Sequence, residues 1–474
     1  MAKDLRTYLA QLRENCPEEL LEIEKPVDCR LEATTVLRKL ELENRSPMTV
    51  FRNPLNLKGE ASAFPLVFNA FSTRQKLCTA VGMPREEAKM PLSLEINHRF
   101  ANRIPPEVIP AEFAPVKEVR LQEDEASFLE LPIPVHHTFD GGPYILGGTI
   151  VTRDPDSGRF NLAMIRIHIK DAHTAVIHAE PHHHTGMIIR KYGERGEKAP
   201  FAVVIGHHPG FYLGSVWEGP FGTEEYEMAG AALGEAVRLV PSETWGDRIL
   251  VPADAEMVLE CEADWNDKQS EGPIGEHTRH YKNRRNGHVI EQKDPLVRLR
   301  AITHRKDAMY QSLFIGHAEH WLIGSVPKEA VIYEKVRAVC PGIRAVHLTP
   351  GGCGRYICYL SLKQRVGGEA RDAILAAFVS DWHLKYCVAV DEDVDIYSDS
   401  EVLWAIATRT QPDRSTFVVP GVMGATVDPT VDSKTRISSV MGIDATKPFG
   451  QDFSDVCEVP VELLANMRLE DYLS

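Results

Sequence analysis

The sequence predicts a protein of several domains that mixes helices and strands, with a β-rich centre and a layered α/β C-terminal part. The chain has 474 residues, about three times a typical domain of roughly 150 residues, so we expect two or three hydrophobic cores. Its 43% hydrophobic and 26% charged residues are typical of globular proteins, which excludes disordered and fibrous classes. Helix-like and strand-like apolar patterns succeed one another along the chain.

Residues 1–115 are predicted to form an N-terminal α/β domain. Apolar residues with helical spacing lie near both 5–12 and 33–40, and residues 20–23 between them read as extended. Short apolar runs at 48–51 and 64–68 predict strands. The segment 102–116 carries four prolines, which is unfavourable for a helix or a central strand, so we place a domain boundary there.

Residues 116–310 are predicted to form a β-rich central domain and residues 320–474 a C-terminal α/β domain. The predicted central strands are 149–152, 160–169, 174–178, 201–205, 237–240, 257–262 and 296–304, with helices at 186–193 and 224–233. The predicted C-terminal elements are helices 328–339 and 369–383 and strands 343–348, 355–362 and 386–390. Helices and strands that alternate in this way favour a layered arrangement.

Charge, apolar runs and cysteines exclude several classes of function. Lys+Arg 53 against Asp+Glu 68 gives a net charge of −15, which argues against a nucleic-acid partner. No apolar run approaches the roughly 18 residues of a membrane span, so we expect a cytoplasmic protein. The nine cysteines include no Cys-x-x-Cys pair, and we expect reduced thiols. Neither common phosphate-binding glycine motif is present.

Two polar clusters lie in the predicted central domain. The first is Asn161 and Arg166 on one predicted strand, where residues five apart face opposite sides unless a bulge or bend intervenes. The second is the run His178-Ala-Glu-Pro-His-His-His184, which offers at least one well-aimed metal ligand but not three, because neighbouring side chains diverge. Each cluster also has an interpretation without a functional site: the first fits a half-buried strand with a polar residue at each end, and the second fits a polar loop that leads into a helix.

A third cluster carries two carboxylates in the run Glu271-Gly-Pro-Ile-Gly-Glu276. Carboxylates that share a partly dry pocket repel, so one holds a proton at raised pKa and suits general acid catalysis, while a nearby arginine keeps the other ionised. The alternative is a solvated acidic turn. Glu235, at the end of a helix rich in small residues, is a possible oxygen ligand that would complete a site with the histidines.

Taken in order, the motifs of this chain resemble those of the UbiD family of prenylated-FMN-dependent (de)carboxylases. The resemblance rests on Asn161 with Arg166, Pro181-His-His-His184, Leu233-Gly-Glu235, Glu271-Gly-Pro-Ile-Gly-Glu276, Val390-Asp-Glu-Asp-Val-Asp-Ile396, Val402-Leu-Trp-Ala-Ile-Ala-Thr-Arg409 and Met441-Gly-Ile-Asp-Ala-Thr446. It implies a central split β-barrel that binds the flavin and a C-terminal domain that mediates oligomerisation. It also implies a homodimer or higher homo-oligomer that depends on a flavin prenyltransferase for its cofactor.

The resemblance also assigns roles to residues. It implies a divalent metal, usually Mn²⁺, held by Asn161, His183 and Glu235, with K⁺ nearby. Counting from Pro181 selects His183, whereas counting from Arg166 selects His184; we take His183. The implied cofactor contacts are Asn161, Leu162, Arg166, His182, His183 and Glu235. The implied catalytic residues are Glu276, which donates a proton to the carbon that loses CO₂, and Arg166 with Glu271, which support it.

Departures from the family pattern bear on the substrate. Members that act on phenolic acids often have a glycine where this chain has Arg279 in His277-Thr-Arg-His-Tyr281, and some have glutamine where it has His182. We therefore expect reversible decarboxylation of an aromatic or heteroaromatic acid, with His182 and Arg279 as substrate contacts. An α,β-unsaturated acid of the acrylic type is the alternative. A metal-dependent hydrolase and a non-catalytic flavin-binding protein are the alternatives from other classes.

Overall fold

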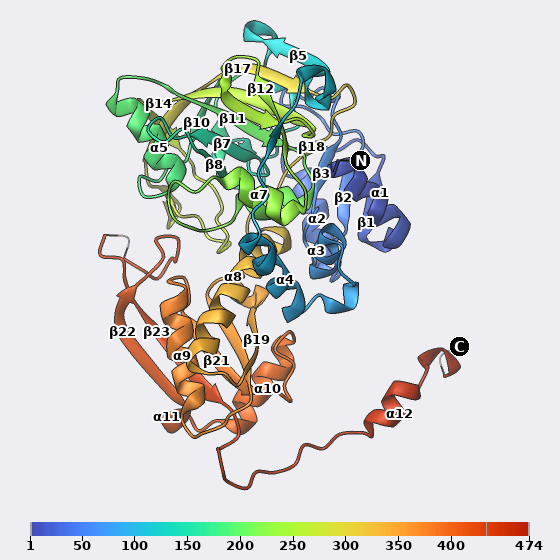
Figure 1. The fold of residues 1–474 in the computed structure, drawn as a ribbon, viewed down its shortest axis with the longest axis vertical. Coiled ribbons are helices and arrows are strands. Elements are labelled where there is room, and N and C mark those ends of the chain that lie inside the picture. Colours follow the sequence, from blue (N-terminus) through green and yellow to red (C-terminus); the bar gives the residue numbers. More distant parts are fainter. Residues whose placement is uncertain (1, 433, 473–474) are drawn as a thin grey trace.

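The computed structural model describes residues 2–432 and 434–472, and its first part packs helices against a small sheet (Figure 1). The elements are α1 (Leu5–Asn15), β1 (Leu20–Ile23), α2 (Glu32–Leu42), β2 (Met48–Phe51), β3 (Leu66–Phe68), α3 (Arg74–Val81), α4 (Met90–Ala101) and the distant β18 (Tyr310–Gln311). The strand order is β1-β2-β3-β18. Because β18 pairs with β3, the chain that leaves the central part completes the N-terminal sheet, and the two parts share a hydrophobic core.

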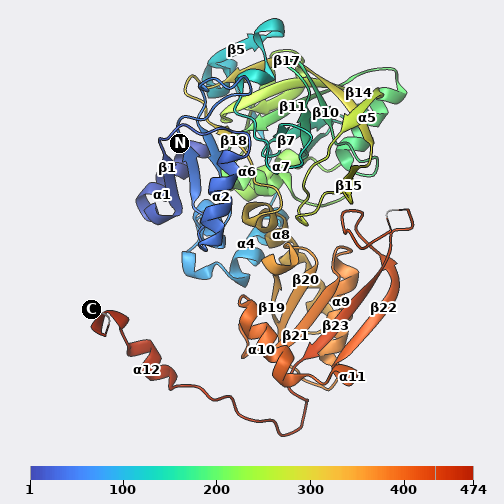
Figure 2. The same ribbon diagram turned by 180° about the vertical axis from the view of Figure 1, so that it is seen from behind.

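The centre of the molecule is a curled, half-barrel-like sheet in which neighbouring strands run antiparallel (Figures 1 and 2). Its strands are β5 (Val119–Gln122), β6 (Tyr144–Ile145), β7 (Thr149–Arg153), β8 (Phe160–Met164), β9 (Ile167–Ile169), β10 (Thr174–Ile177), β11 (Ala199–Ile205), β14 (Met257–Glu271) and β17 (Gln292–His304). The order is β6-β9-β10-β17-β14-β11-β7-β8, and β5 pairs with β17. The mixed α/β fold class predicted from the sequence is confirmed.

Helices and short strands surround the central sheet. The helices are α5 (His184–Glu194), α6 (Pro209–Ser215) and α7 (Glu225–Leu233), and the short strands are β4 (Glu107–Val108), β12 (Arg238–Ser242), β13 (Gly246–Pro252), β15 (Arg284–Arg285) and β16 (His288–Val289). α6 and α7 pack on each other beside β8, and α5 packs against β14. These contacts bring the beginnings of α5 and α7 close to β8.

Two central strands differ from their predicted extent. The predicted strand 160–169 is divided into β8 and β9, which pair with different neighbours, and residues 165 and 166 lie between them. The predicted strand 257–262 continues as far as Glu271. Its second half is partly exposed and polar, so an apolar pattern could not reveal it.

The C-terminal part is a layered α/β unit with its own apolar cores. Its elements are α8 (Ala318–Val339), β19 (Ile343–Leu348), β20 (Ile357–Leu362), α9 (Glu369–Ser380), β21 (Tyr386–Asp391), α10 (Asp399–Arg409), α11 (Pro412–Ser415), β22 (Thr416–Met423) and β23 (Ile437–Ala445). The sheet order is β19-β20-β21-β23-β22. Helix α8 begins ten residues earlier than the predicted start at 328, and Pro327 lies inside it.

Two of the C-terminal motifs meet in a structural ion cluster. Arg409 at the end of α10 binds Asp391 over 3.0 Å and Asp393 over 2.9 Å, and Lys447 donates its backbone N–H to Asp391. These residues tie α10 and the end of β23 to the end of β21.

The described chain ends in a tail that leaves the C-terminal part and carries helix α12 (Val461–Asn466) and a short turn of helix at Leu469–Asp471 (Figures 1 and 2). Its large apolar side chains are exposed, among them Leu463, Leu464, Met467 and Tyr472. Within residues 2–432 and 434–472, no helix combines the length and the apolar character needed to cross a bilayer.

Candidate active site

A buried arginine between two carboxylates is the centre of the candidate active site. The Arg166 guanidinium donates to both oxygens of Glu271, over 2.9 Å from Nε to Oε1 and 3.2 Å from Nη2 to Oε2. Its Nη1 donates to Oε1 of Glu276 over 2.5 Å. The three residues are 9%, 1% and 7% exposed in that order, a depth at which charges persist only when they are paired. The structure thus brings together the three residues assigned to one network from the sequence.

The interrupted strand explains how Arg166 reaches its partners. In a continuous strand, alternation would turn Asn161 and Arg166 to opposite faces. Because β8 ends at Met164 and β9 begins at Ile167, this alternation is broken immediately before Arg166. The backbone carbonyl of Arg166 accepts a hydrogen bond from His178 N–H over 3.2 Å, which fixes the bend against the next strand.

The turn after β14 places the two carboxylates on the same arginine. Gly272 has φ +89°, and a Cβ there would overlap Nδ2 of Asn283, so this position favours glycine strongly. Asn283 donates to the backbone carbonyl of Glu271 over 3.1 Å, and Gly275 donates its N–H to Asp140 over 3.1 Å. The turn is therefore held at both ends, with Glu271 before it and Glu276 after it.

Glu271 is the ionised member of the network. Burial alone would raise its pKa, but the Arg166 guanidinium outweighs burial and holds the pKa below its ordinary value. The Tyr144 hydroxyl donates to Glu271 Oε1 over 3.1 Å, and burial together with that carboxylate raises the pKa of Tyr144. Glu271 is thus a fixed negative charge whose oxygens are occupied by donors.

A histidine and an aspartate that we did not assign to this site lie beside Glu271. His178 Nδ1 lies 3.0 Å from Oδ2 of Asp294, and Gln292 donates to the same carboxylate over 2.6 Å. Ligand-capable atoms of His178, Glu271 and Asp294 all lie within 4.8 Å of one another. Glu271 pairs with Gln292 between β14 and β17, so Asp294, two residues further, shares its face of the sheet. The sequence shows that β17 begins with polar residues, but it does not show which residue of β14 each of them faces.

A second polar group forms where β8 meets the beginnings of α5 and α7. Asn161 Nδ2 donates to Thr185 Oγ1 over 3.0 Å, and His184 Nδ1 lies 3.3 Å from Oε1 of Glu225. The backbone N–H of Leu162 donates to Oε2 of Glu225 over 2.5 Å. Burial raises the pKa of Glu225, with His184 acting in the opposite direction. His184 and Glu225 thus meet directly, while Asn161 bonds to Thr185, the residue after His184, and lies next to Leu162, which bonds to Glu225. Amide, imidazole and carboxylate groups are donor types that suit Mn²⁺ or a similar divalent ion.

The expectation that Glu235 belongs to this group does not hold in the structure. Glu235 follows the end of α7, and its Oε1 accepts a hydrogen bond from Lys3 N over 2.7 Å. Glu225 starts the same helix, whose nine residues span roughly 13 Å at 1.5 Å per residue. The two carboxylates therefore lie at opposite ends of α7, and the one that contacts β8 and His184 is Glu225.

The remaining assigned residues lie at the surface. His182 and His183 are exposed, and His183 precedes α5 as its N-cap residue, so His184 is the histidine that meets Glu225. The count from Arg166, which selected His184, agrees with this arrangement. Arg279 is exposed with φ +60°, and its backbone N–H donates to the carbonyl of Glu276 over 2.9 Å.

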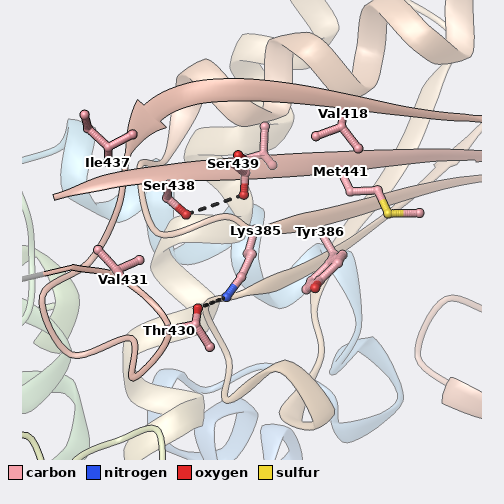
Figure 3. A pocket seen from close by; sticks show the side chains of 10 residues that line it. Lys385, Tyr386, Val418, Thr430, Val431, Ile437, Ser438, Ser439 and Met441 are labelled. Carbon is pink, nitrogen blue, oxygen red and sulfur yellow. Dashed lines mark hydrogen bonds between the residues drawn. The ribbon is translucent and has the colours of Figure 1, made fainter. Parts of the chain in front are cut away.

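A separate shallow pocket of about 460 Å³ lies on the C-terminal sheet (Figure 3). Its lining residues come from β21, β22, β23 and the segment near Thr430, and Lys385 donates there to Thr430 over 2.6 Å. Lys385 also pairs with Asp428 over 2.8 Å, so its charge is already satisfied. None of the Arg166 network or of the Asn161 group lines this pocket.

Comparison with protein families covers nearly the whole chain. Residues 10–89 match the N-terminal domain of 3-octaprenyl-4-hydroxybenzoate carboxy-lyase. Residues 108–318 match its Rift-related domain, and residues 321–445 match its C-terminal domain.

Individual relatives agree with this assignment. Anhydromevalonate phosphate decarboxylase of Methanosarcina mazei is 31% identical over 93% of this chain and 96% of that protein. The UbiD-class enzyme HmfF of Pelotomaculum thermopropionicum, solved in complex with FMN, superposes with a TM-score of 0.89 at 33% identity, covering 99% of this chain and 100% of that one. Apo 3,4-dihydroxybenzoic acid decarboxylase (AroY) of Klebsiella pneumoniae shares the fold, with a TM-score of 0.86 over all of both chains at 24% identity. The chain therefore belongs to the UbiD family of carboxy-lyases.

Proposed function

We propose that this protein catalyses the reversible, non-oxidative decarboxylation of an aromatic or heteroaromatic carboxylic acid with prenylated FMN as its cofactor. The observation that carries the proposal is the buried arrangement of Arg166 between Glu271 and Glu276. It combines a fixed positive charge, an ionised carboxylate and a second carboxyl group. Together these groups can hold one proton and transfer it to a substrate atom.

The chemistry explains why a cofactor is needed. Departure of CO₂ leaves an electron pair on carbon that no protein side chain can delocalise, and prenylated FMN, when bound, supplies that electron sink. The protein then has to return one proton to the same carbon. We assign this step to the Glu276 carboxyl, while Arg166 orients it and Glu271 balances the charge of Arg166. In the reverse direction Glu276 removes the proton, and high CO₂ favours carboxylation.

We propose that Asn161, His184 and Glu225 hold a divalent ion, with Mn²⁺ as the expected metal, which binds the phosphate of the cofactor. The residues fit this role, because they offer amide, imidazole and carboxylate donors from neighbouring segments of β8, α5 and α7. Exposed His182 and His183 remain candidate contacts of the cofactor, and K⁺ is expected in the same region. We also propose that the protein obtains its cofactor from a flavin prenyltransferase, forms a homo-oligomer and is located in the cytoplasm.

A second candidate substrate class deserves a place in the test. Two relatives at 31% identity are named anhydromevalonate phosphate decarboxylases and not decarboxylases of an aromatic acid, which is a reason to test the acrylic-type alternative. Arg279 and His182 are our candidate contacts for a polar or anionic substituent of either kind of acid.

The deciding experiment is production of the protein together with a flavin prenyltransferase, followed by a screen for CO₂ release. The panel pairs aromatic and heteroaromatic acids with acrylic-type acids of similar size. We expect CO₂ from members of the first set, dependent on the prenylated flavin. Release from acrylic-type acids alone would select the second class. Loaded protein that releases CO₂ from no acid, or metal-loaded protein that is active without flavin, would contradict the proposal.

A further inference from the structure

We infer that the central and C-terminal parts together form a second anion-binding position at the active site, from His277, Arg355 and Tyr356, and that the substrate carries a second carboxylate or a phosphate there. This inference rests on the proposed function, because it names the substrate class for the same site. It differs from the surface role considered for Arg279, because it depends on buried groups whose hydrogen-bonding capacity is unused.

Arg355 is a cation with unused donors. Its Nη1 is buried and has no hydrogen-bond partner in the part of the chain that the structure describes. Two carboxylates lie near it, Glu218 and Asp381, but both bind Lys328, over 3.2 Å each. Burial lowers the pKa of Arg355 despite these carboxylates. Arg355 as a whole is half-buried, and a buried guanidinium nitrogen without a partner carries a desolvation cost that a bound anion would offset.

The fold holds this guanidinium in place. It lies against helix α8 at Gly324, where an added Cβ would overlap both Nη1 and Nη2. Arg355 itself follows the tight turn Pro350–Gly352, and its backbone N–H donates to the carbonyl of Gly352 over 3.1 Å. The turn therefore fixes the backbone of Arg355, and its guanidinium packs against α8 at Gly324.

Two more buried polar atoms without partners lie beside it. Nε2 of His277 and the hydroxyl of Tyr356 have no hydrogen-bond partner among the described residues. The rings of His277 and Tyr356 lie 5.8 Å apart between centroids. His277 is held from α8, because Trp321 Nε1 donates to its backbone carbonyl over 2.7 Å. Three unsatisfied groups from the central and C-terminal parts thus gather at one junction.

All three groups can donate to an anion. Burial, followed by the nearby Arg355, lowers the pKa of His277 far below its ordinary value, so its imidazole is neutral with one N–H. Burial also lowers the pKa of His320, whose ring lies 6.0 Å from that of His277, to about 3. Burial raises the pKa of Tyr356, which keeps its hydroxyl proton. A planar guanidinium with hydroxyl and imidazole donors matches the oxygens of a carboxylate or a phosphate.

The junction adjoins the reacting centre. His277 directly follows Glu276 in the chain, and Tyr356 is close enough for the charge of Glu276 to contribute to its raised pKa. A substrate whose departing carboxyl group faces Arg166 and Glu276 would thus direct its far end to Arg355. The substrate class that we infer is an acid with two anionic groups on opposite sides of one rigid unit.

The test compares three ligands that share one ring: benzoate, terephthalate and 4-phosphonobenzoate. Binding to the flavin-loaded protein is measured by calorimetry for the wild type, Arg355→Gln, Arg355→Lys and Arg344→Gln. Arg344 is a matched control, a half-exposed arginine of the same part that pairs with Glu392 over 3.0 Å. Loss of a charged hydrogen bond should weaken the preferred dianion about 10- to 100-fold in Arg355→Gln and leave benzoate unchanged. Arg355→Lys should retain part of the affinity, and Arg344→Gln all of it.

The two dianions separate the possible sources of the second charge. Tighter binding of terephthalate identifies a dicarboxylic acid, and tighter binding of 4-phosphonobenzoate identifies a phosphorylated acid. A wild type that prefers neither dianion over benzoate overturns the inference. So does an Arg355→Gln variant that loses benzoate and dianion equally.

Two further measurements exclude a merely structural role. Removal of an unpaired buried charge should leave Tm equal to or above that of the wild type, whereas a lower Tm for Arg355→Gln contradicts the inference. Gly324→Ala, which displaces the guanidinium without removing it, should reproduce the selective loss of dianion binding. Because these assays need no turnover, Arg355-dependent binding without CO₂ release from any acid would contradict only the proposed function. Normal turnover of every acid by Arg355→Gln would contradict only this inference.

Discussion

At the scale of single residues, Arg166 determines what its two carboxylates can do. It uses two nitrogens on Glu271 and one on Glu276, so the two acids are held unequally. Glu271 also receives the Tyr144 hydroxyl and lies near His178, whereas among the described residues the side chain of Glu276 is held by Arg166 alone. The more loosely held acid is the one free to turn toward a substrate, which supports Glu276 as the proton donor.

The first prediction separates the two acids. Glu276→Gln should bind cofactor and substrate but turn over about 10²–10⁴-fold more slowly, because it removes one positioned general acid. It should also abolish exchange of the substrate hydrogen for deuterium at the reacting carbon in D₂O, measured by NMR. Glu271→Gln is the comparison. If Glu271→Gln abolishes exchange while Glu276→Gln preserves it, the two roles are reversed, and if both variants remain active the mechanism fails.

The second prediction concerns the metal group. Glu225→Ala should give a folded protein that retains little cofactor and little Mn²⁺, because a carboxylate ligand between Asn161 and His184 is lost. Glu235→Ala, ten residues later on the far side of α7, is the matched control and should retain both. Flavin absorbance and metal analysis of the purified proteins measure the outcome. Full occupancy in Glu225→Ala, or loss in Glu235→Ala alone, would restore the original assignment.

The third prediction follows from His178. Burial and the nearby Arg166 lower its pKa, but the carboxylates of Asp294 and Glu180 outweigh them and raise it above the ordinary value. A raised pKa in the native state contributes stability that is present below about pH 6.5, the ordinary histidine value, and is lost as the pH rises through the native value.

His178→Asn should therefore lower Tm more at pH 6 than at pH 8.5 relative to the wild type. The exposed His288 provides the control, and His288→Asn should show no such trend. A Tm difference for His178→Asn that stays constant or grows with pH would contradict the assignment.

At the scale of elements, local sequence patterns predicted where several strands begin and end. They did not predict features that depend on how strands and helices pack against one another. Strands 20–23 and 48–51 were predicted to the residue, because short apolar runs are bounded there by polar residues. The end of β14 was missed because it is polar and partly exposed, yet it delivers Glu271. Glu235 was preferred to Glu225 because a family motif does not tell which end of a nine-residue helix faces the strand beside it.

The fourth prediction tests the turn after β14. Gly272→Ala should destabilise the protein by about 1–3 kcal/mol through its left-handed backbone, and should also reduce turnover, because the added Cβ meets Asn283 and shifts the two carboxylates. Gly59 has a similar φ of +81° with open space around it, so Gly59→Ala should cost similar stability with normal turnover. Chemical unfolding and kcat measure the two effects. Equal turnover in both variants would show that the turn does not set the geometry of the site.

At the scale of the whole molecule, the tail that carries α12 is a segment whose large apolar side chains are not buried in the fold. Leu463, Leu464, Met467, Leu469 and Tyr472 are each more than half exposed on a segment that extends away from the rest (Figure 2). Exposed apolar side chains gathered on one segment mark an interaction surface. Combined with the proposed homo-oligomer, this favours a second copy of the chain as the partner of the tail.

The fifth prediction removes the tail. The 474-residue chain should be a homo-oligomer in light scattering, and a variant that ends at residue 450 should have a smaller mass, because the apolar contacts of α12 are lost. Leu463→Ser with Leu464→Ser is the milder variant and should weaken assembly in a concentration-dependent way. An unchanged mass after truncation would place the interface elsewhere. Flavin binding should persist, since the Asn161 group lies in the central part.

The attachment of His277 to Trp321 has a consequence for how such enzymes diversify. The groups assigned to proton transfer all come from the curled sheet and its turn, whereas Arg355 and Trp321 come from the neighbouring C-terminal unit, which contacts that turn through the Trp321–His277 hydrogen bond. Mutations in that unit can alter which acid is selected while the reaction itself stays intact. Exchange of α8 and of residues 350–356 between relatives would therefore change substrate specificity, in evolution or by engineering, while the catalytic residues stay the same.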